Sequence, residues 1–538
     1  MSKSPAPGPP RGFLGWVERT GNRLPDPVVI FLILTFALII ASVVAAAVGV
    51  SALHPTQVDE NGKPEVIRSL SLLASENIRR LWVEMPATFT HFHPLGYVLV
   101  VMLGAGVAER SGLFAAAMRA AVRSAPRSLL TPVVALVAMI GNHAADAGYV
   151  VLIPLAGILY AVAGRHPLAG IAASFAGVSG GFSANISPGQ LDALLFGITE
   201  QAVQASKLDP SWHMNIAGNW YFITAMTVVF LPVIWYVTDR VIEPRLGKWQ
   251  PEGDMATIYG ADHHQALSAD QRKGLTWAGL AALAVAGLWV FMTLGPDTPL
   301  IHEEACTPEL TAAGQCSLHT QLRPMYSSLV AAFFLLFLGA GYAYGLAVKS
   351  IANHRDLVKM MADAMKDMGY YLVLAFAAAH FVAMFGWSNL GLISAVHGAQ
   401  AIQSTGLPLA AVLGLVVLFT GALNLFIGSA SAKWALLAPV LVPMLMLLGV
   451  SPEGATAAYR VGDSATNIIT PLMVYFPLIL VFAQRWRTDF GLGSLTAMMI
   501  PYSVWILVVG LALTLAWVAL GAPLGPDASV TYQLPMRG

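Results

Sequence analysis

The stretch GVSGGFSANISPGQLDALL, residues 177–195, decides the fold because it interrupts a long apolar segment with polar residues and helix breakers. A glycine pair, Asn185, Pro188 and Asp192 stand where a membrane-spanning helix would carry leucine, valine or alanine. Backbone released from a helix cannot face lipid and is tolerated only where it lines a cavity or is buried in protein. The stretch therefore predicts a broken helix beside a binding site.

The composition indicates a membrane protein. Of 538 residues, 57% are hydrophobic and 11% charged, whereas soluble proteins carry about 25% charged residues. Apolar segments long enough to span a bilayer recur along the whole chain. They cover 28–50, 94–113, 131–163, 168–198, 219–238, 275–293, 326–346, 370–386, 410–448, 455–484 and 495–520. The net charge is zero and no basic tract occurs, so we expect no nucleic-acid partner.

Loop charge sets the topology, because Lys and Arg collect on the cytoplasmic side. Basic loops at 239–273 and 347–369, and the arginines of segment 1–27, place the N-terminus inside. The number of membrane crossings agrees with the sides assigned to the loops only if 131–163 and 410–448 each enter and leave the membrane on the same side. We predict an all-α polytopic membrane protein with nine transmembrane helices and two re-entrant hairpins, its C-terminus outside.

The two hairpins begin two similar units. Pro154 and Pro167 match Pro439 and Pro452 at the same offset of 285 residues, and SANISP answers SATNIITP in the following broken spans. The hairpins enter from opposite sides, so the repeats are inverted, which is typical of secondary transporters. The predicted organisation is 1–27 cytoplasmic, 28–113 the first two spans, 131–198 repeat 1 (131–163 and 168–198), 219–386 intervening spans, 410–484 repeat 2 (410–448 and 455–484), 495–520 the last span and 521–538 a tail.

Few ionisable residues lie within the spans, and each costs about 2.5–3.5 kcal/mol at the bilayer centre even on lenient scales. Asp192, Arg460 and Asp463 are therefore expected to serve the site. The alternatives are a structural ion pair between Arg460 and Asp463, which are three residues apart on one helix, and an Asp192 carboxylate that reaches water. Lys433 is expected to extend its side chain to the membrane interface.

Uncharged polar residues extend the candidate site. Asn185, Asn467 and Asp463 offer the hard oxygens that Na⁺ requires, although the two amides would equally suit capping of broken backbone. Asn424 is expected to face the cavity. Trp434 would stack on an aromatic substrate or simply pack in the core.

Four longer motifs resemble the AbgT family of bacterial inner-membrane p-aminobenzoyl-glutamate transporters. They are GFLGWVERTGNRLPDPVVIFL (12–32), GFSANISPGQLDALL (181–195), GSASAKWALLAPVLVPML (428–445) and YRVGDSATNIITPLMVYFPLIL (459–480). The resemblance implies a homodimer of nine spans and two hairpins, with 219–386 as scaffold. It also implies proton-driven transport, sulfonamide export in some members, and a bound Na⁺. Residues implied to serve transport are Asp192, Asn424, Ser431, Trp434, Pro452, Arg460 and Asp463.

Other function classes fit the sequence less well. A Na⁺-coupled dicarboxylate or citrate symporter would share hairpins and Ser-Asn breaks but would not need Trp434. An intramembrane enzyme using His143 and Asp146 lacks a second histidine or metal triad and leaves the repeat unexplained, so we expect no enzyme and no cofactor apart from Na⁺. A passive channel would not require two opposed hairpins. Whether Cys306 and Cys316 form a disulfide stays open.

Overall fold

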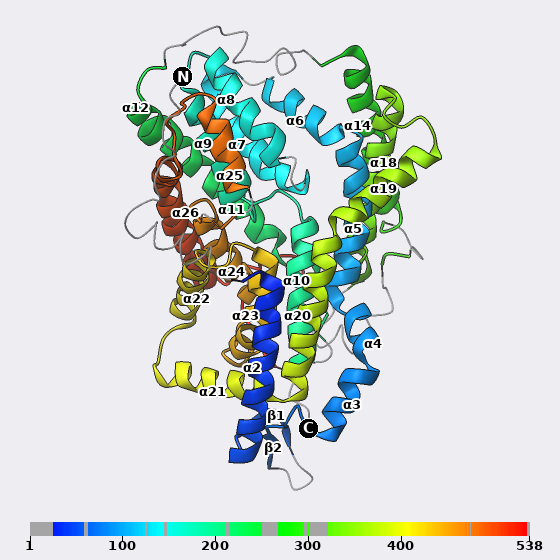
Figure 1. The fold of residues 1–538 in the computed structure, drawn as a ribbon, viewed down its shortest axis with the longest axis vertical. Coiled ribbons are helices and arrows are strands. Elements are labelled where there is room, and N and C mark those ends of the chain that lie inside the picture. The colour runs from blue at the N-terminus through cyan, green and yellow to red at the C-terminus, as the bar shows by residue number, and fades with distance from the viewer. Residues whose placement is uncertain are drawn as a thin grey trace, which may run out of the picture.

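Long apolar helices dominate the computed structural model (Figure 1), which describes residues 25–58, 63–123, 126–144, 148–209, 212–213, 215–249, 267–294, 299–301, 321–470, 472–473 and 475–534. Asp146, Cys306 and Cys316 lie outside these residues. Seven described helical segments are long and apolar enough to cross a membrane. They are α2 (Pro27–Val48), the segment Ile216–Leu246 around α11 (Trp220–Tyr236), α14 (Ala269–Phe291), α18 (Leu329–Val348), α20 (Gly369–Trp387), α23 (Ala430–Leu447) and α26 (Leu492–Leu520).

An eighth span arises if α5 (His93–Arg110) and α6 (Leu113–Arg123) count as one, although they bend by 65° at the break. The helical membrane architecture is thus confirmed. The count of nine spans with two re-entrant hairpins stays a prediction.

Helix pairs form at both predicted hairpins. In the first, α7 (Leu130–Ile140) and the turn η2 (Gly141–Ala144) are followed by η3 (Gly148–Leu152) and α8 (Ile153–Val162). In the second, α22 (Leu409–Asn424) is separated from α23 by a short non-helical turn. Each break falls at the polar stretch that the sequence places at the hairpin tip.

Both predicted breaks in the following spans are present as well. The first unit runs through α9 (Pro167–Phe175) and η4 (Ala176–Gly180), loses helical structure, and resumes as α10 (Gln190–Ser206). The second consists of α24 (Pro452–Asn467) and α25 (Phe476–Gln484). Proline begins α9 and α24, where its missing N–H costs nothing. Helix α10 packs on α23 and α24, and α22 packs on α24, so the two units meet in the middle of the molecule (Figure 1).

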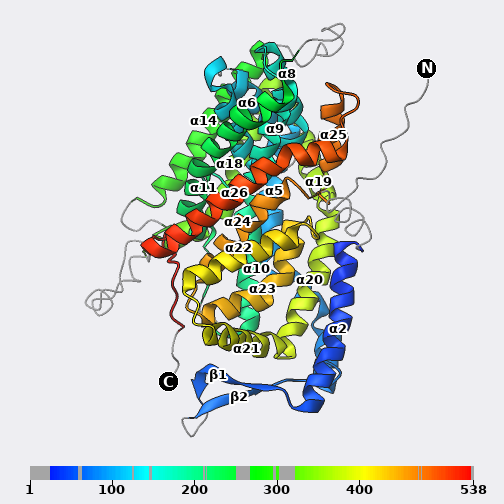
Figure 2. The ribbon, with the colours of Figure 1, turned by 90° about the vertical axis from the view of Figure 1, so that its left-hand side faces the viewer.

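The region 51–93 departs from an all-α description. Strands β1 (Ser51–Val58) and β2 (Pro64–Arg68) form an antiparallel hairpin with Ala52 opposite Ile67. Figure 2 shows this hairpin at one end of the molecule, below α21 (Leu390–Ser404). The hydropathy pattern does not predict these strands, because they are too short and too polar to span a bilayer. The remaining described elements are α3 (Ser75–Val83), α4 (Met85–Thr90), η1 (Arg127–Leu129), η5 (Ile216–Asn219), η6 (Val237–Ile242), α12 (Glu243–Leu246), α17 (Arg323–Ser327) and α19 (His354–Asp367).

The segment after α26 returns to the second unit. The N–H of Ser451, which caps α24, donates to the Val530 carbonyl at 2.9 Å, and the N–H of Tyr532 donates to the Gly449 carbonyl at 2.8 Å. The Tyr532 hydroxyl donates to Asp209, and burial with this carboxylate raises the tyrosine's pKa. The tail therefore fixes the start of the helix that carries Arg460 and Asp463.

Candidate functional site

An ion pair joins the two repeats. Arg460 Nη2 on α24 lies 2.7 Å from Asp192 Oδ1 in the first turn of α10. The second oxygen of Asp192 accepts a hydrogen bond from the Gly189 N–H at 2.8 Å. Asp192 therefore caps the helix that resumes after the first break and also neutralises a cation from the second repeat. It is 4% exposed, so the alternative of a water-exposed carboxylate is wrong for this structure.

A second ion pair lies within repeat 2, where the Lys433 ammonium on α23 contacts Asp463 on α24. Lys433 is 0% and Asp463 1% exposed. The expectation that Lys433 reaches the interface is wrong, as is the alternative that Arg460 pairs with Asp463. Sequence spacing showed only which residues share a face of α24, whereas packing against α10 and α23 supplies each residue with its opposite charge.

The two pairs lie one helical turn apart. Residues three apart on a helix have Cβ atoms about 5–6 Å apart, which sets the spacing of Arg460 and Asp463 on α24. Two cations and two anions thus form a buried, neutral group. Such pairs add little net stability because desolvation offsets their attraction. Their presence favours a role in binding.

Several polar atoms beside the pairs lack a hydrogen-bond partner. Among the described buried side chains these include Asp463 Oδ2, Arg460 Nε, Asn424 Oδ1 and Ser464 Oγ. The large majority of buried polar atoms in proteins are paired. The concentration of unpaired donors and acceptors at one place therefore indicates a site that contacts a ligand or an ion.

Trp434 and Asn424 are both fully buried. Trp434 Nε1 donates to Thr199 Oγ1 at 3.0 Å and its ring lies 4.5 Å from that of Tyr459. Trp434 therefore packs between helices, as one of the two sequence alternatives proposed. The Asn424 amide donates to the Asp463 carbonyl at 3.1 Å, which ties α22 to the second ion pair rather than to an open cavity.

The other predicted residues lie at the ends of the same helices. Ser431 is in the first turn of α23, where its hydroxyl is 3.3 Å from that of Ser429, the residue that caps this helix. Pro452 is the first residue of α24. Ser431 thus lies two residues before Lys433 at the start of α23, whereas Pro452 lies eight residues before Arg460 at the start of α24.

The two asparagines of the repeats bind backbone near the breaks. Asn467 Nδ2 donates to the Ser179 carbonyl and Asn185 Nδ2 to the Met139 carbonyl, each at 3.3 Å. Both contacts agree with the capping alternative. The three predicted Na⁺ ligands contact different neighbours, since Asp463 is paired with Lys433. No group of three His, Cys, Asp or Glu suited to a metal occurs in the part of the chain that the structure describes.

His143 lies against the first break. Its Nε2 is 3.0 Å from Ser187 Oγ, and a Cβ at Gly189 would meet the ring at 2.3 Å. Only a glycine allows this approach. The histidine therefore contacts the first break through Ser187 and Gly189.

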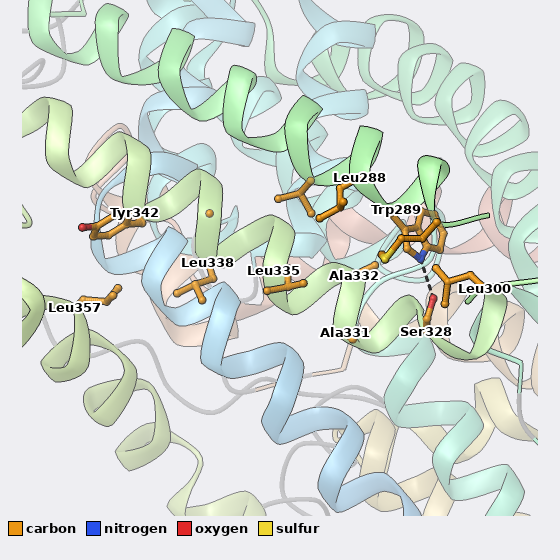
Figure 3. A pocket seen from close by; sticks show the side chains of 13 residues that line it. Leu288, Trp289, Leu300, Ser328, Ala331, Ala332, Leu335, Leu338, Tyr342 and Leu357 are labelled. Carbon is orange, nitrogen blue, oxygen red and sulfur yellow. Dashed lines mark hydrogen bonds between the residues drawn. The ribbon is translucent and has the colours of Figure 1, made fainter. Parts of the chain in front are cut away.

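A well-formed groove lies away from these charges. It has a volume of about 550 Å³ between α14 and α18 and is lined by apolar residues such as Trp289, Leu335 and Leu338 (Figure 3). The small cavity that reaches Ser431 measures only about 10 Å³. The residues that line the groove include no charged side chain, so it is not the candidate site, and the four charged side chains of the candidate site are themselves buried.

Comparison with known proteins assigns the family. The sequence profile of the AbgT putative transporter family matches residues 12–532. The chain belongs to the AbgT family. This AbgT-family protein is 35% identical over 528 residues to the p-aminobenzoyl-glutamate transport protein of Escherichia coli K12, covering 98% of each chain.

Two solved structures of transporters share the fold. The Alcanivorax borkumensis YdaH transporter matches with a TM-score of 0.84 at 39% identity, covering 93% of this chain and all of YdaH. Neisseria gonorrhoeae MtrF, from a class described as antimetabolite efflux pumps, matches with a TM-score of 0.86 at 41% identity, covering 96% of this chain and all of MtrF. The protein is therefore a multi-pass membrane protein of a transporter family, and its named relatives are transport proteins.

Proposed function

We propose that this protein is a secondary active transporter of p-aminobenzoyl-glutamate and related folate-type antimetabolites, including sulfonamides, in the bacterial inner membrane. A proton or sodium gradient drives it through alternating access of an elevator-like kind. The proposal includes a homodimer, nine spans with two re-entrant hairpins, and a cytoplasmic N-terminus. The named relative from E. coli supports the substrate, and MtrF supports the antimetabolites.

The observation that carries the proposal is the pair of buried ion pairs where the repeats meet. The substrate has two carboxylates and an aromatic ring. An arginine such as Arg460 binds a carboxylate through two parallel hydrogen bonds. Helices α10 and α23 both begin beside the charges, and helix N-termini favour anions. A dicarboxylate can therefore replace the two aspartates as partner of the cations.

The coupling ion would bind to an aspartate carboxylate that the substrate has displaced from its cation. Asp192 and Asp463 can take a proton, and Asp463 with Asn185 and Asn467 would supply the oxygens for Na⁺. A Na⁺-coupled dicarboxylate symporter is the second candidate. It is favoured by the burial of Trp434, whose ring packs against Tyr459 and is not open for a substrate ring to stack on.

Flux of radiolabelled p-aminobenzoyl-glutamate into proteoliposomes, with pH and Na⁺ gradients imposed separately, tests the proposal. We expect flux that follows one gradient and is abolished in Asp463→Ala, since this change leaves Lys433 without its counterion. Asp489→Ala, at an exposed pair with Arg487, is the matched control and should transport normally. Transport by Asp463→Ala at the wild-type rate would disprove the role of this residue. No flux of this substrate by the folded wild type would favour the dicarboxylate alternative and a screen of small di-acids.

A further inference from the structure

We propose that Lys433 and Arg460 are matched receptors for the two carboxylates of one dianionic substrate, and that Asp463 and Asp192 each bind a proton as the substrate displaces them. The inference rests on the proposed function and makes it specific. Substrate and about two protons then bind together and move in the same direction, as in a symporter.

The surroundings of Lys433 give the first support for this proposal. Its side chain is fully buried, its ammonium contacts Asp463, and the ring of Tyr459 lies 5.2 Å from the nitrogen. A buried ammonium without a counterion is strongly unfavourable. An anion that takes the place of Asp463 keeps the Lys433 ammonium paired, and a substrate carboxylate is such an anion.

Arg460, one turn before Asp463 on α24, is likewise a buried cation paired with an aspartate. Its partner Asp192 comes from α10, whereas Asp463, the partner of Lys433, lies three residues after Arg460 on α24 itself, so the two pairs share α24 and their carboxylates come from different helices. The α- and γ-carboxylates of a glutamyl group are likewise held close by a short aliphatic chain. A substrate of this class can reach both cations at once.

Charge balance then fixes the number of protons. Before binding, the two pairs are neutral together. If both aspartates stayed ionised beside a bound dianion, two uncompensated negative charges would be buried, which is very costly. One proton from the solvent adds to each carboxylate, and each cation binds a substrate carboxylate, so the loaded site is neutral again. Release of the substrate returns both protons to the solvent on the other side.

The structure provides an atom for one of these protons. Asp463 Oδ2 has no hydrogen-bond partner among the described residues, so a proton binds there without breaking a bond. Asp192 differs because its Oδ2 accepts from the Gly189 N–H. Protonation of Asp192 therefore also loosens the start of α10, which links substrate binding to the helix break.

The other titratable groups packed around the pairs have their own contacts. The Tyr459 hydroxyl donates to the Ala430 carbonyl, His143 contacts Ser187, and Glu200 contacts His213 and Tyr97. Glu453 interacts with Trp212 and Ser451, whereas the Tyr371 hydroxyl, beside the small cavity near Ser431, has no hydrogen-bond partner among the described residues. Among the described hydrogen bonds and ion pairs, none joins these groups to the four charges. The two aspartates are therefore the proton acceptors that substrate binding exposes.

Isothermal titration calorimetry on the purified full-length protein tests the inference. Titrations near neutral pH in two buffers of different ionisation enthalpy give the number of protons bound with each ligand. We expect wild type to take up about two protons with p-aminobenzoyl-glutamate and about one with p-aminobenzoyl-glutamine, which lacks the γ-carboxylate. Lys433→Gln should take up about one proton with either ligand and lose its preference for the glutamate compound.

Two further variants serve as controls for this experiment. Lys433→Gln/Asp463→Asn replaces the pair with neutral groups of similar size and should also take up about one proton, so a folding defect of the single variant does not decide the result. Lys366→Gln, at an exposed pair with Asp363, should behave as wild type. Binding without proton uptake, or an uptake of two protons by either Lys433 variant, would overturn this inference alone. Absence of binding by the wild type would overturn the proposed substrate, and this inference with it.

Discussion

At the scale of single residues, the buried pair of Lys433 and Asp463 should respond very differently to single and double substitution. Removing one partner of a buried pair leaves an uncompensated charge and typically costs about 3–5 kcal/mol, whereas replacing both by apolar residues is often neutral. We expect Lys433→Ala to lower the free energy of unfolding by this amount and Lys433→Met/Asp463→Leu to restore most of it. Unfolding in mixed micelles, followed by far-UV circular dichroism, measures both.

A control variant and the double variant together separate the effect of an unpaired charge from the effect of lost packing. Lys366→Ala removes a lysine from an exposed pair with Asp363 and should leave unfolding unchanged. If the double variant were as unstable as Lys433→Ala, lost packing rather than an unpaired charge would explain the effect.

The sequence indicated which charged residues lie within the membrane segments, and the structure shows them buried, but their partners could not be predicted. The cost of burying charge singled out Asp192, Arg460 and Asp463. Helical spacing shows which side chains share a face, yet it does not show which neighbouring helix lies against that face. The predicted position of the Lys433 side chain at the membrane interface was wrong for the same reason, because a lysine near a hairpin tip can reach either water or a buried carboxylate. Two cations and two anions in the repeats were the signal that could have indicated pairing between helices.

At the scale of helices, the contact between α22 and α24 depends on Gly462. A Cβ at this position would lie 2.2 Å from both the Val417 carbonyl and Thr420 Oγ1. Backbone atoms on a packed helix cannot yield easily, and overpacking costs typically 1–3 kcal/mol. We expect Gly462→Ala to separate the second hairpin from the helix that carries the charges and to reduce transport.

Gly279→Ala is the matched control for this prediction. Gly279 lies within α14, and a Cβ there would meet no atom within 4 Å. Thermal stability and substrate flux of the two variants should be measured together. Wild-type stability and flux in Gly462→Ala would show that α22 and α24 separate without loss of function.

The elements were predictable where polarity interrupts a long apolar run. Both hairpin turns and both helix breaks fall where glycine, asparagine and proline enter such runs, since these residues end helices at membrane depth. The strands β1 and β2 and the helix α19 were missed because hydropathy detects spans and not short or amphipathic elements outside them. The hairpin formed by β1 and β2 instead depends on tertiary contacts such as that of the Asn389 amide with the Arg68 carbonyl.

At the scale of the whole molecule, the two ion pairs differ in what they connect. Arg460 and Asp192 join repeat 2 to repeat 1, as does the contact of Asn467 with the Ser179 carbonyl. Lys433 and Asp463 join the hairpin of repeat 2 to its own broken helix. Opening between the repeats therefore separates the first pair, whereas withdrawal of the second hairpin separates the second. A substrate that bridges both cations would couple these two movements.

Symport of two protons with each dianionic substrate predicts an electroneutral transport cycle. If two protons accompany each dianion, no net charge crosses the membrane, so a K⁺ diffusion potential set with valinomycin should not change the flux of p-aminobenzoyl-glutamate into proteoliposomes. Each proton contributes about 1.4 kcal/mol per pH unit, and a gradient of one pH unit, acidic outside, should therefore sustain up to about 100-fold accumulation inside. Flux that responds to the potential, with accumulation limited to about tenfold, would indicate a single proton. Inhibition by acid on the side of the substrate would indicate that protons compete with it, as in an antiporter.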